Sequence, residues 1–141
     1  MKEIEIYQVD HTSKISLPMA GESIHAGFPS PAQDYMLDSI DLNKECIRHP
    51  ATTFYGRVVG DSMEDAGVHE GDILVIDKSL EPSDGKMAVC FIDGEFTLKT
   101  IFMKDNAILL VPANPQYPTI RVTENNDFQI WGIVTYIIKR V

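Results

Sequence analysis

The most informative stretch for the fold is KMAVCFIDGEFTLKTIFM, residues 86–103. Two runs rich in β-branched and aromatic residues, 86–92 and 95–103, lie on either side of Asp93-Gly94. An Asp-Gly pair favours the tight turn that joins two antiparallel strands, because both turn positions need a positive φ. The sequence therefore predicts a β-hairpin, which fixes how far along its second strand Lys99 lies.

Similar short runs occur along the rest of the chain after residue 50, at 53–59, 73–76, 107–111, 119–122 and 128–139. Pairs and clusters of Gly, Pro, Asn and Asp separate them, as expected for turns. A short helix is expected from Asp41, the N-cap, to a stop at Pro50. We therefore expect a mainly β fold of small, strongly twisted sheets with one or two short helices.

Composition places the chain among globular, single-domain proteins. It has 141 residues, 44% of them hydrophobic and 23% charged, which is enough for one core and too little for two ordinary domains. No apolar run approaches the roughly 18 residues of a membrane span. The acidic start Met-Lys-Glu-Ile-Glu does not resemble a signal peptide, so a cytoplasmic protein is expected. Cys46 and Cys90 make no disulfide framework and are expected to be reduced thiols.

The charge balance bears on the partners. A formal net charge of −9 argues against direct nucleic-acid binding, which depends on Lys and Arg contacts with phosphates. Protein partners are the better expectation. The histidines show no metal-ligand spacing, so neither a metal site nor a cofactor is assigned; they are His11, His25, His49 and His69.

Residues 1–26 lack a sustained helical or alternating period and are expected to form a flexible or weakly docked arm. The segment 26–31, Ala-Gly-Phe-Pro-Ser-Pro, follows. Its prolines bias Phe28 and Ser30 toward extended geometry, in which proteases bind substrates. The small pair Ala26-Gly27 would let a nucleophile approach the backbone closely. A plain Pro-rich turn explains the same segment.

Ser62 lies where a strand gives way to a short helix. The β-branched run ends at Gly60, Ser62 follows, and a few helix-forming residues end at Gly67. Backbone N–H groups at such a turn are free to point toward an oxyanion. The simpler interpretation of a serine in a turn is that it caps the helix.

Lys99 is the second candidate. It lies within the apolar, alternating segment 96–101, where a cation is costly unless it loses its proton. A serine and a neutral lysine suffice for nucleophilic catalysis. A free lysine has a pKa near 10.4, so a base working near neutrality needs a shift of roughly 3 units, about 4 kcal/mol. Alternation does not fix which face Lys99 takes, and a lysine that points to solvent is the simpler interpretation.

Two other chemistries fit less well. A Ser-His-Asp triad has the composition but lacks a G-x-S-x-G elbow. Glu64 and Asp65 are adjacent carboxylates, and they are better placed to stabilise the first turn of a helix than to act as an acid–base pair.

Three motifs, in order, resemble the self-cleaving serine peptidases of the LexA type, whose fold is of the LexA/signal-peptidase kind: Gly60-Asp61-Ser62-Met63, residues 71–77 and residues 93–99. Residues 27–32, 34–35, 40–43, 49–50, 112–114 and 131–134 are similar to the UmuD-like branch. The resemblance spans roughly residues 20–140. Residue 26 is Ala, where some UmuD sequences have Cys.

The resemblance implies specific roles. Ser62 would be the nucleophile, Lys99 the general base, and the scissile bond would join Ala26 to Gly27. The backbone N–H groups of Ser62 and Asp61 would hold the oxyanion. Self-cleavage would remove an arm, residues 1–26, from a peptidase domain, residues 27–141.

The resemblance also implies partners. The RecA–single-stranded-DNA filament would stimulate cleavage. The shortened chain, as a homodimer, would join a UmuC-type DNA polymerase that copies past lesions in the SOS response. Three alternatives stay open: the C-terminal domain of a LexA-like or phage repressor, a peptidase acting on other proteins, and a catalytically idle β-rich interaction module.

Overall fold

The computed structural model describes residues 3–10, 16–20 and 36–141. By internal contacts the chain divides into two compact units. One unit joins residues 1–9 to residues 49–141, and the other is residues 10–48. The larger unit contains the features on which the candidate site depends.

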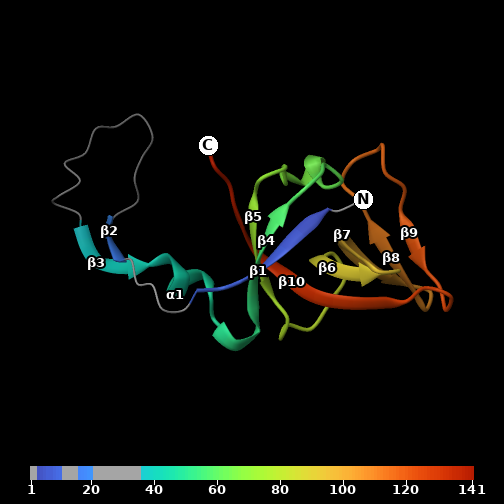
Figure 1. The fold of residues 1–141 in the computed structure, drawn as a ribbon, viewed down its shortest axis with the longest axis horizontal. Coiled ribbons are helices and arrows are strands. Elements are labelled where there is room, and N and C mark those ends of the chain that lie inside the picture. The colour runs from blue at the N-terminus through green and yellow to red at the C-terminus, as the bar shows by residue number, and fades with distance from the viewer. Residues whose placement is uncertain (1–2, 11–15, 21–35) are drawn as a thin grey trace. The chain divides into compact units, whose positions relative to one another are not determined.

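The larger unit is built on an antiparallel sheet (Figure 1). In the described part of the chain the strand order is β1-β4-β5-β10-β6-β7-β8-β9. The strands are β1 (Ile4–Gln8), β4 (Thr53–Val58), β5 (Ile73–Asp77), β6 (Met87–Ile92), β7 (Glu95–Lys104), β8 (Ala107–Val111), β9 (Ile120–Val122) and β10 (Phe128–Ile138). This confirms the prediction of a mainly β fold, and every strand expected after residue 50 forms.

The described part of the smaller unit consists of a two-stranded sheet and one short helix. Strand β2 (Ser16–Ala20) pairs with β3 (Met36–Asp41), and helix α1 (Leu42–Cys46) follows directly. The Asp41 carboxylate accepts a hydrogen bond from the Asn43 N–H at 3.0 Å, so Asp41 is the predicted N-cap. The helix ends at Cys46, earlier than Pro50. Across the described residues, no helix is long and apolar enough to cross a membrane.

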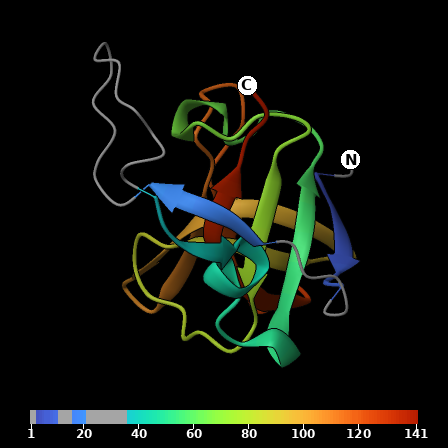
Figure 2. The ribbon, with the colours of Figure 1, turned by 90° about the vertical axis from the view of Figure 1, so that its left-hand side faces the viewer.

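The expectation of a flexible or weakly docked arm is wrong for residues 4–8, which form β1, and for residues 16–20, which form β2. Strand β1 pairs with β4 in register over its whole length, from Ile4 opposite Val58 to Gln8 opposite Phe54. Figure 2 shows β1, in dark blue, beside the green β4. The pattern Ile4-Glu5-Ile6 does alternate, and Ile4 is 2% exposed. The alternation is only a few residues long, so a search for a sustained period misses it.

The central hairpin forms as predicted. Asp93 and Gly94 have φ of 49° and 89°, the conformation that a two-residue turn between antiparallel strands requires. The resulting register sets Lys99 of β7 opposite Ala88 of β6. A second turn of the same kind, at Asp105-Asn106, joins β7 to β8.

Two clusters of buried side chains lie along β6 and β7. Val89 and Leu98 belong to the first, with Ile4 and Met63 among their neighbours. Cys90, Ala88 and Ile101 belong to the second. Successive side chains of a strand point to opposite faces, so Lys99 shares its face of β7 with Thr97 and Ile101, opposite to Leu98. This settles the orientation that the sequence left open.

A buried carboxylate at the end of β5 joins this strand to residues 49–52. Asp77 is 4% exposed and lies 2.5 Å from His49 Nδ1. It also accepts from the Thr52 hydroxyl at 2.9 Å and from the N–H and hydroxyl of Ser79. Burial alone raises the pKa of Asp77, but these hydrogen bonds outweigh it and hold the pKa at about 2.

We therefore predict a specific acid sensitivity. The folded pKa of Asp77 lies below its ordinary 3.8, so its contribution to stability is present above about pH 4 and is lost as pH falls toward 2. Asp77→Asn should lower the free energy of unfolding at neutral pH by about 2 kcal/mol. It should also flatten the loss of stability between these pH values. Urea unfolding across this range checks both, with the exposed Glu124→Gln as the control. An unchanged pH profile in Asp77→Asn would contradict the assignment.

Candidate active site

Ser62 lies in a turn between strand β4 and a short 3₁₀ helix. After β4 the chain turns at Gly60, which has a φ of 99°, and passes Ser62 into a short 3₁₀ helix, Glu64–Ala66. Gly67 closes this helix with a left-handed φ of 80°, as the sequence predicted. Met63 is 2% exposed and packs in the first buried cluster. Ser62 itself is only 6% exposed.

The structure brings the two candidate catalytic side chains together. Lys99 Nζ lies 3.3 Å from Ser62 Oγ, although Lys99 is on β7 and Ser62 follows β4. Lys99 is 2% exposed. Its amine also lies 2.6 Å from the Thr97 hydroxyl oxygen and 3.2 Å from the Leu98 carbonyl oxygen. The amine is therefore enclosed by acceptors within the protein.

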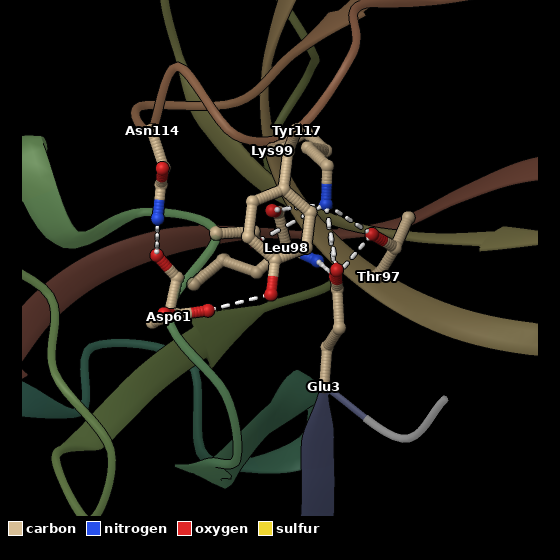
Figure 3. Close-up of polar contacts among 8 residues, drawn as sticks. Glu3, Asp61, Thr97, Leu98, Lys99, Asn114 and Tyr117 are labelled. Carbon is tan, nitrogen blue, oxygen red and sulfur yellow. Dashed lines mark hydrogen bonds and ion pairs between the residues drawn. The ribbon is translucent and has the colours of Figure 1, made fainter.

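A carboxylate from the N-terminus completes this arrangement. Glu3 precedes β1, and its Oε1 and Oε2 lie 3.0 and 2.9 Å from Lys99 Nζ. The same carboxylate accepts hydrogen bonds from the Thr97 hydroxyl and from the Leu98 N–H, the latter at 3.1 Å. Figure 3 shows the Glu3 side chain directed at this group. Lys99 is thus closer to Glu3 and Thr97 than to Ser62.

The residues after β8 brace the Ser62 turn; we call residues 113–117 the bracing segment. The Asn114 amide donates to the Asp61 carbonyl oxygen at 2.9 Å. The Tyr117 hydroxyl donates to the Asp61 carboxylate at 2.5 Å, and the Ala113 N–H donates to the Ser62 carbonyl at 2.8 Å. The bracing segment therefore holds the carbonyl groups of both Asp61 and Ser62, and Figure 3 shows the contacts of Asn114 and Tyr117 with Asp61.

The carboxylates around the site also act on Tyr117. Its hydrogen bond to Asp61, followed by burial and the negative charges of Asp61 and Glu3, raises the pKa of Tyr117. The phenol therefore keeps its proton and remains a hydrogen-bond donor to Asp61.

The two cysteines are free, as expected, and neither is an activated nucleophile. Burial raises the pKa of Cys90 to about 12, despite an opposing effect from the positive charge of Lys99. Burial, followed by the charge of Glu45, raises the pKa of Cys46. Since a thiolate is the reactive form, both thiols are unreactive near neutral pH.

The other residues singled out in the sequence do not join this site. Glu64 and Asp65 are exposed on the 3₁₀ helix. His69 lies beside Lys139, 3.0 Å from its Nζ. No three His, Cys, Asp or Glu side chains among the described residues are grouped to hold a metal ion. The proposed scissile pair, Ala26-Gly27, lies outside the described residues, as do His11 and His25.

Sequence reasoning missed four contributors: Glu3, Thr97, Asn114 and Tyr117. Thr97 had a usable signal, because residues two apart on a strand share a face. Asn114 appeared only as part of a turn and of the family resemblance. Nothing local to Glu3 indicated a partner 96 positions away.

Comparison of the sequence with known proteins identifies its family. The Peptidase S24-like family matches residues 18–135 of the chain. Protein SamA of Salmonella typhimurium is 46% identical over 123 residues, which cover 87% of this chain and 85% of SamA. Protein MucA of Salmonella typhimurium is 39% identical over 136 residues, covering 95% of this chain and 92% of MucA.

A more distant relative is the LexA repressor of an Acidovorax strain. It is 32% identical over 127 residues, which cover 90% of this chain but only 56% of the repressor. SamA and MucA are UmuD-like proteins. The match to the peptidase family spans most of the chain and includes both side chains of the buried Ser–Lys pair. The chain belongs to the Peptidase S24-like family, in its UmuD-like group.

Proposed function

We propose that this protein is a self-cleaving serine peptidase that cuts its own Ala26–Gly27 bond, with Ser62 as nucleophile and Lys99 as general base. The observation that carries the proposal is the 3.3 Å contact between Ser62 Oγ and Lys99 Nζ inside a buried site. Membership of a peptidase family supports the same activity. A hydroxyl next to an amine that water scarcely reaches is the pair that serine–lysine catalysis uses.

The chemistry follows from the contacts of the amine. A neutral Lys99 has two hydrogens and one lone pair. The Thr97 oxygen and the Leu98 carbonyl are placed to accept the hydrogens, which turns the lone pair toward Ser62. The amine takes the Ser62 proton as Oγ attacks the Ala26 carbonyl carbon. The proton then passes to the departing Gly27 nitrogen, and water hydrolyses the resulting ester.

The bracing segment is suited to prepare the oxyanion site. The Asp61 carbonyl oxygen and the Ser62 N–H belong to one planar peptide unit and point in opposite directions. The Asn114 amide holds that carbonyl, so it also fixes where the Ser62 N–H points. We propose that this N–H, together with that of Asp61, stabilises the oxyanion formed at Ala26.

The biological setting is proposed by analogy with the UmuD-like relatives. A substrate tethered in the same chain reaches a high effective concentration once it docks. We propose that, in the cytoplasm, a RecA–single-stranded-DNA filament favours docking of the segment that contains the Ala26–Gly27 bond. Residues 27–141 would then act as the homodimeric accessory subunit of a UmuC-type translesion polymerase during the SOS response. The chain is 46% identical to SamA and 39% identical to MucA but 32% identical to the LexA repressor, which supports this role.

The first prediction concerns the cut itself. Purified protein held at about pH 10, where lysine loses its proton more readily, should yield a single cut after Ala26, identified by intact-mass measurement. Ser62→Ala should abolish cleavage. Lys99→Ala should slow it by at least about 10²-fold, the usual contribution of a general base.

The controls separate the alternatives. An intact wild-type chain at high pH, and also with activated RecA filament, would identify an idle interaction module. Cuts at other bonds, or in added proteins, would indicate a peptidase of broader specificity. Binding of the shortened chain to a UmuC-type polymerase would separate an accessory subunit from a repressor fragment.

A second prediction concerns the brace. Asn114→Ala frees the Asp61–Ser62 peptide unit and should slow cleavage by about 10-fold or more, less than the loss of a direct oxyanion donor. Tyr117→Phe removes one exposed hydrogen bond and should slow it by only a few-fold. Cleavage rates of folded variants at fixed high pH check both, with the exposed Tyr136→Phe as the matched control. Wild-type rates in Asn114→Ala would rule out this positioning role.

A further inference from the structure

In the uncut chain, Lys99 of the catalytic pair is already bound by a carboxylate of the same chain. Glu3 contacts Lys99 through both carboxylate oxygens, at 3.0 and 2.9 Å, and also contacts Thr97 and the Leu98 N–H. An ammonium, a hydroxyl and a backbone N–H are the donors that a carboxylate-binding site uses. Glu3 satisfies all three donors at once. This inference rests on the proposed function, because it concerns the regulation of the same Ser–Lys site.

The contact opposes catalysis through charge. A carboxylate in direct contact with an amine stabilises the charged form by Coulomb attraction, and an ammonium has no lone pair with which to take the Ser62 proton. Two further titratable groups respond to charge at this site. Burial raises the pKa of Cys90 on β6 although the charge of Lys99 opposes this, so Cys90 is a neutral thiol. The charge of Glu3 contributes to the raised pKa of Tyr117, which is a neutral phenol. The Glu3 carboxylate, in contrast, is charged and is in direct contact with the Lys99 amine.

The contact also covers backbone that an extended substrate would need. Strand β6 pairs with β7 along residues 95–100, whereas β8 pairs with β7 only from Thr100 onward. Within the described residues, the other edge of β7 before Thr100 is therefore not paired with a strand. On this edge the Leu98 N–H donates a hydrogen bond to the Glu3 carboxylate at 3.1 Å. A peptide adding to this edge as a strand would compete for that donor.

The backbone of Glu3 is anchored next to strand β1, which fixes the position of its side chain. The Glu3 carbonyl accepts from the Val59 N–H at 2.7 Å, and Ile4, the next residue, is buried in the first cluster. Five residues of β1 then pair with β4. The carboxylate is thus delivered to Lys99 by a docked strand. Ser62 is 6% exposed in this state.

We propose that the Ser62–Lys99 site is also a carboxylate-binding site, and that Glu3 is its built-in ligand, which keeps the uncut chain latent until β1 leaves the sheet. Docking of the scissile segment and docking of Glu3 are then mutually exclusive. The cut at Ala26 removes Glu3 together with the rest of residues 1–26, so the site in the product has lost its own inhibitor.

The first test measures self-cleavage of the full chain without a trigger. Glu3→Gln keeps the shape and removes the ion pair that holds residue 3 against Lys99, so it should cleave at least about 10-fold faster than wild type near neutral pH. Glu5→Gln, two residues away and hydrogen-bonded to Tyr7, is the matched control and should behave as wild type. Glu3→Gln combined with Ser62→Ala should not cleave.

The second test measures the hydrogen bond between the Leu98 N–H and Glu3 independently of catalysis. Glu3→Ala removes the acceptor of the Leu98 N–H, so hydrogen exchange at the Leu98 amide, measured by NMR, should be at least about 10-fold faster than in wild type. The same amide in Glu5→Gln should exchange at the wild-type rate. Urea unfolding of each variant establishes that the remainder of the sheet is intact.

The outcomes distinguish this proposal from the proposed function. If wild type cuts after Ala26 at high pH but Glu3→Gln is no faster at neutral pH, the latency proposal is overturned and the peptidase stands. If no variant with Ser62 cuts under any condition, the peptidase proposal fails. In that case unchanged Leu98 exchange in Glu3→Ala overturns carboxylate binding as well, whereas faster exchange retains the site as a structural ion pair only and overturns latency.

Discussion

The site depends on the placement of a lysine amine in the interior of a β-sheet. Lys99 is 2% exposed, and a buried amine must be neutral or be paired with an anion. The surroundings of Lys99 allow both solutions. Thr97 and the Leu98 carbonyl suit a neutral amine that faces Ser62, and the Glu3 carboxylate suits an ammonium. The two forms differ in chemistry, because only the neutral form can act as a base.

The curl of the sheet makes this arrangement possible. Strands β1 and β7 are first and sixth in the strand order, yet Glu3 beside β1 bonds to Thr97 and Lys99 on β7. A flat sheet would hold these strands far apart, since neighbouring strands are spaced by about 4.8 Å. The turn after β4 and the segment after β8 meet at the same place, which brings Asp61 next to Asn114. The site is therefore made from the ends of strands that are distant in sequence.

Local sequence patterns predicted the parts of the structure that depend on local chemistry. The Asp93-Gly94 turn, the Asp41 cap and the end of the short helix at Gly67 each follow from a residue's own backbone preference or hydrogen-bonding capacity, and all three form. The pairing of Ser62 with Lys99 was reached through family resemblance, since periodicity gave no face for Lys99. The structure then supplied that face through the register of β6 with β7.

The contacts that could not be predicted are those made at long range. Strand β1 was missed because Ile4 and Ile6 alternate over too short a stretch, and its stability comes from pairing with β4 and from burial of Ile4 rather than from propensity. Glu3 follows from β1, so missing the strand also concealed the carboxylate. The bracing role of Tyr117 depends on the path of the chain after β8, which turn residues alone do not specify.

Strand β1 has one more consequence, for the surface of the molecule. Within the described sheet β1 is at one end of the order and pairs with β4. The side chain of Ile4 fills the space that Gly56 leaves open, since a Cβ there would lie 2.6 Å from the Ile4 terminal methyl. Loss of β1 would leave a bare row of backbone donors and acceptors along β4, beside a vacated apolar hollow. Such an exposed strand edge readily accepts an extended segment from another chain, so loss of β1 would change which proteins the sheet can bind.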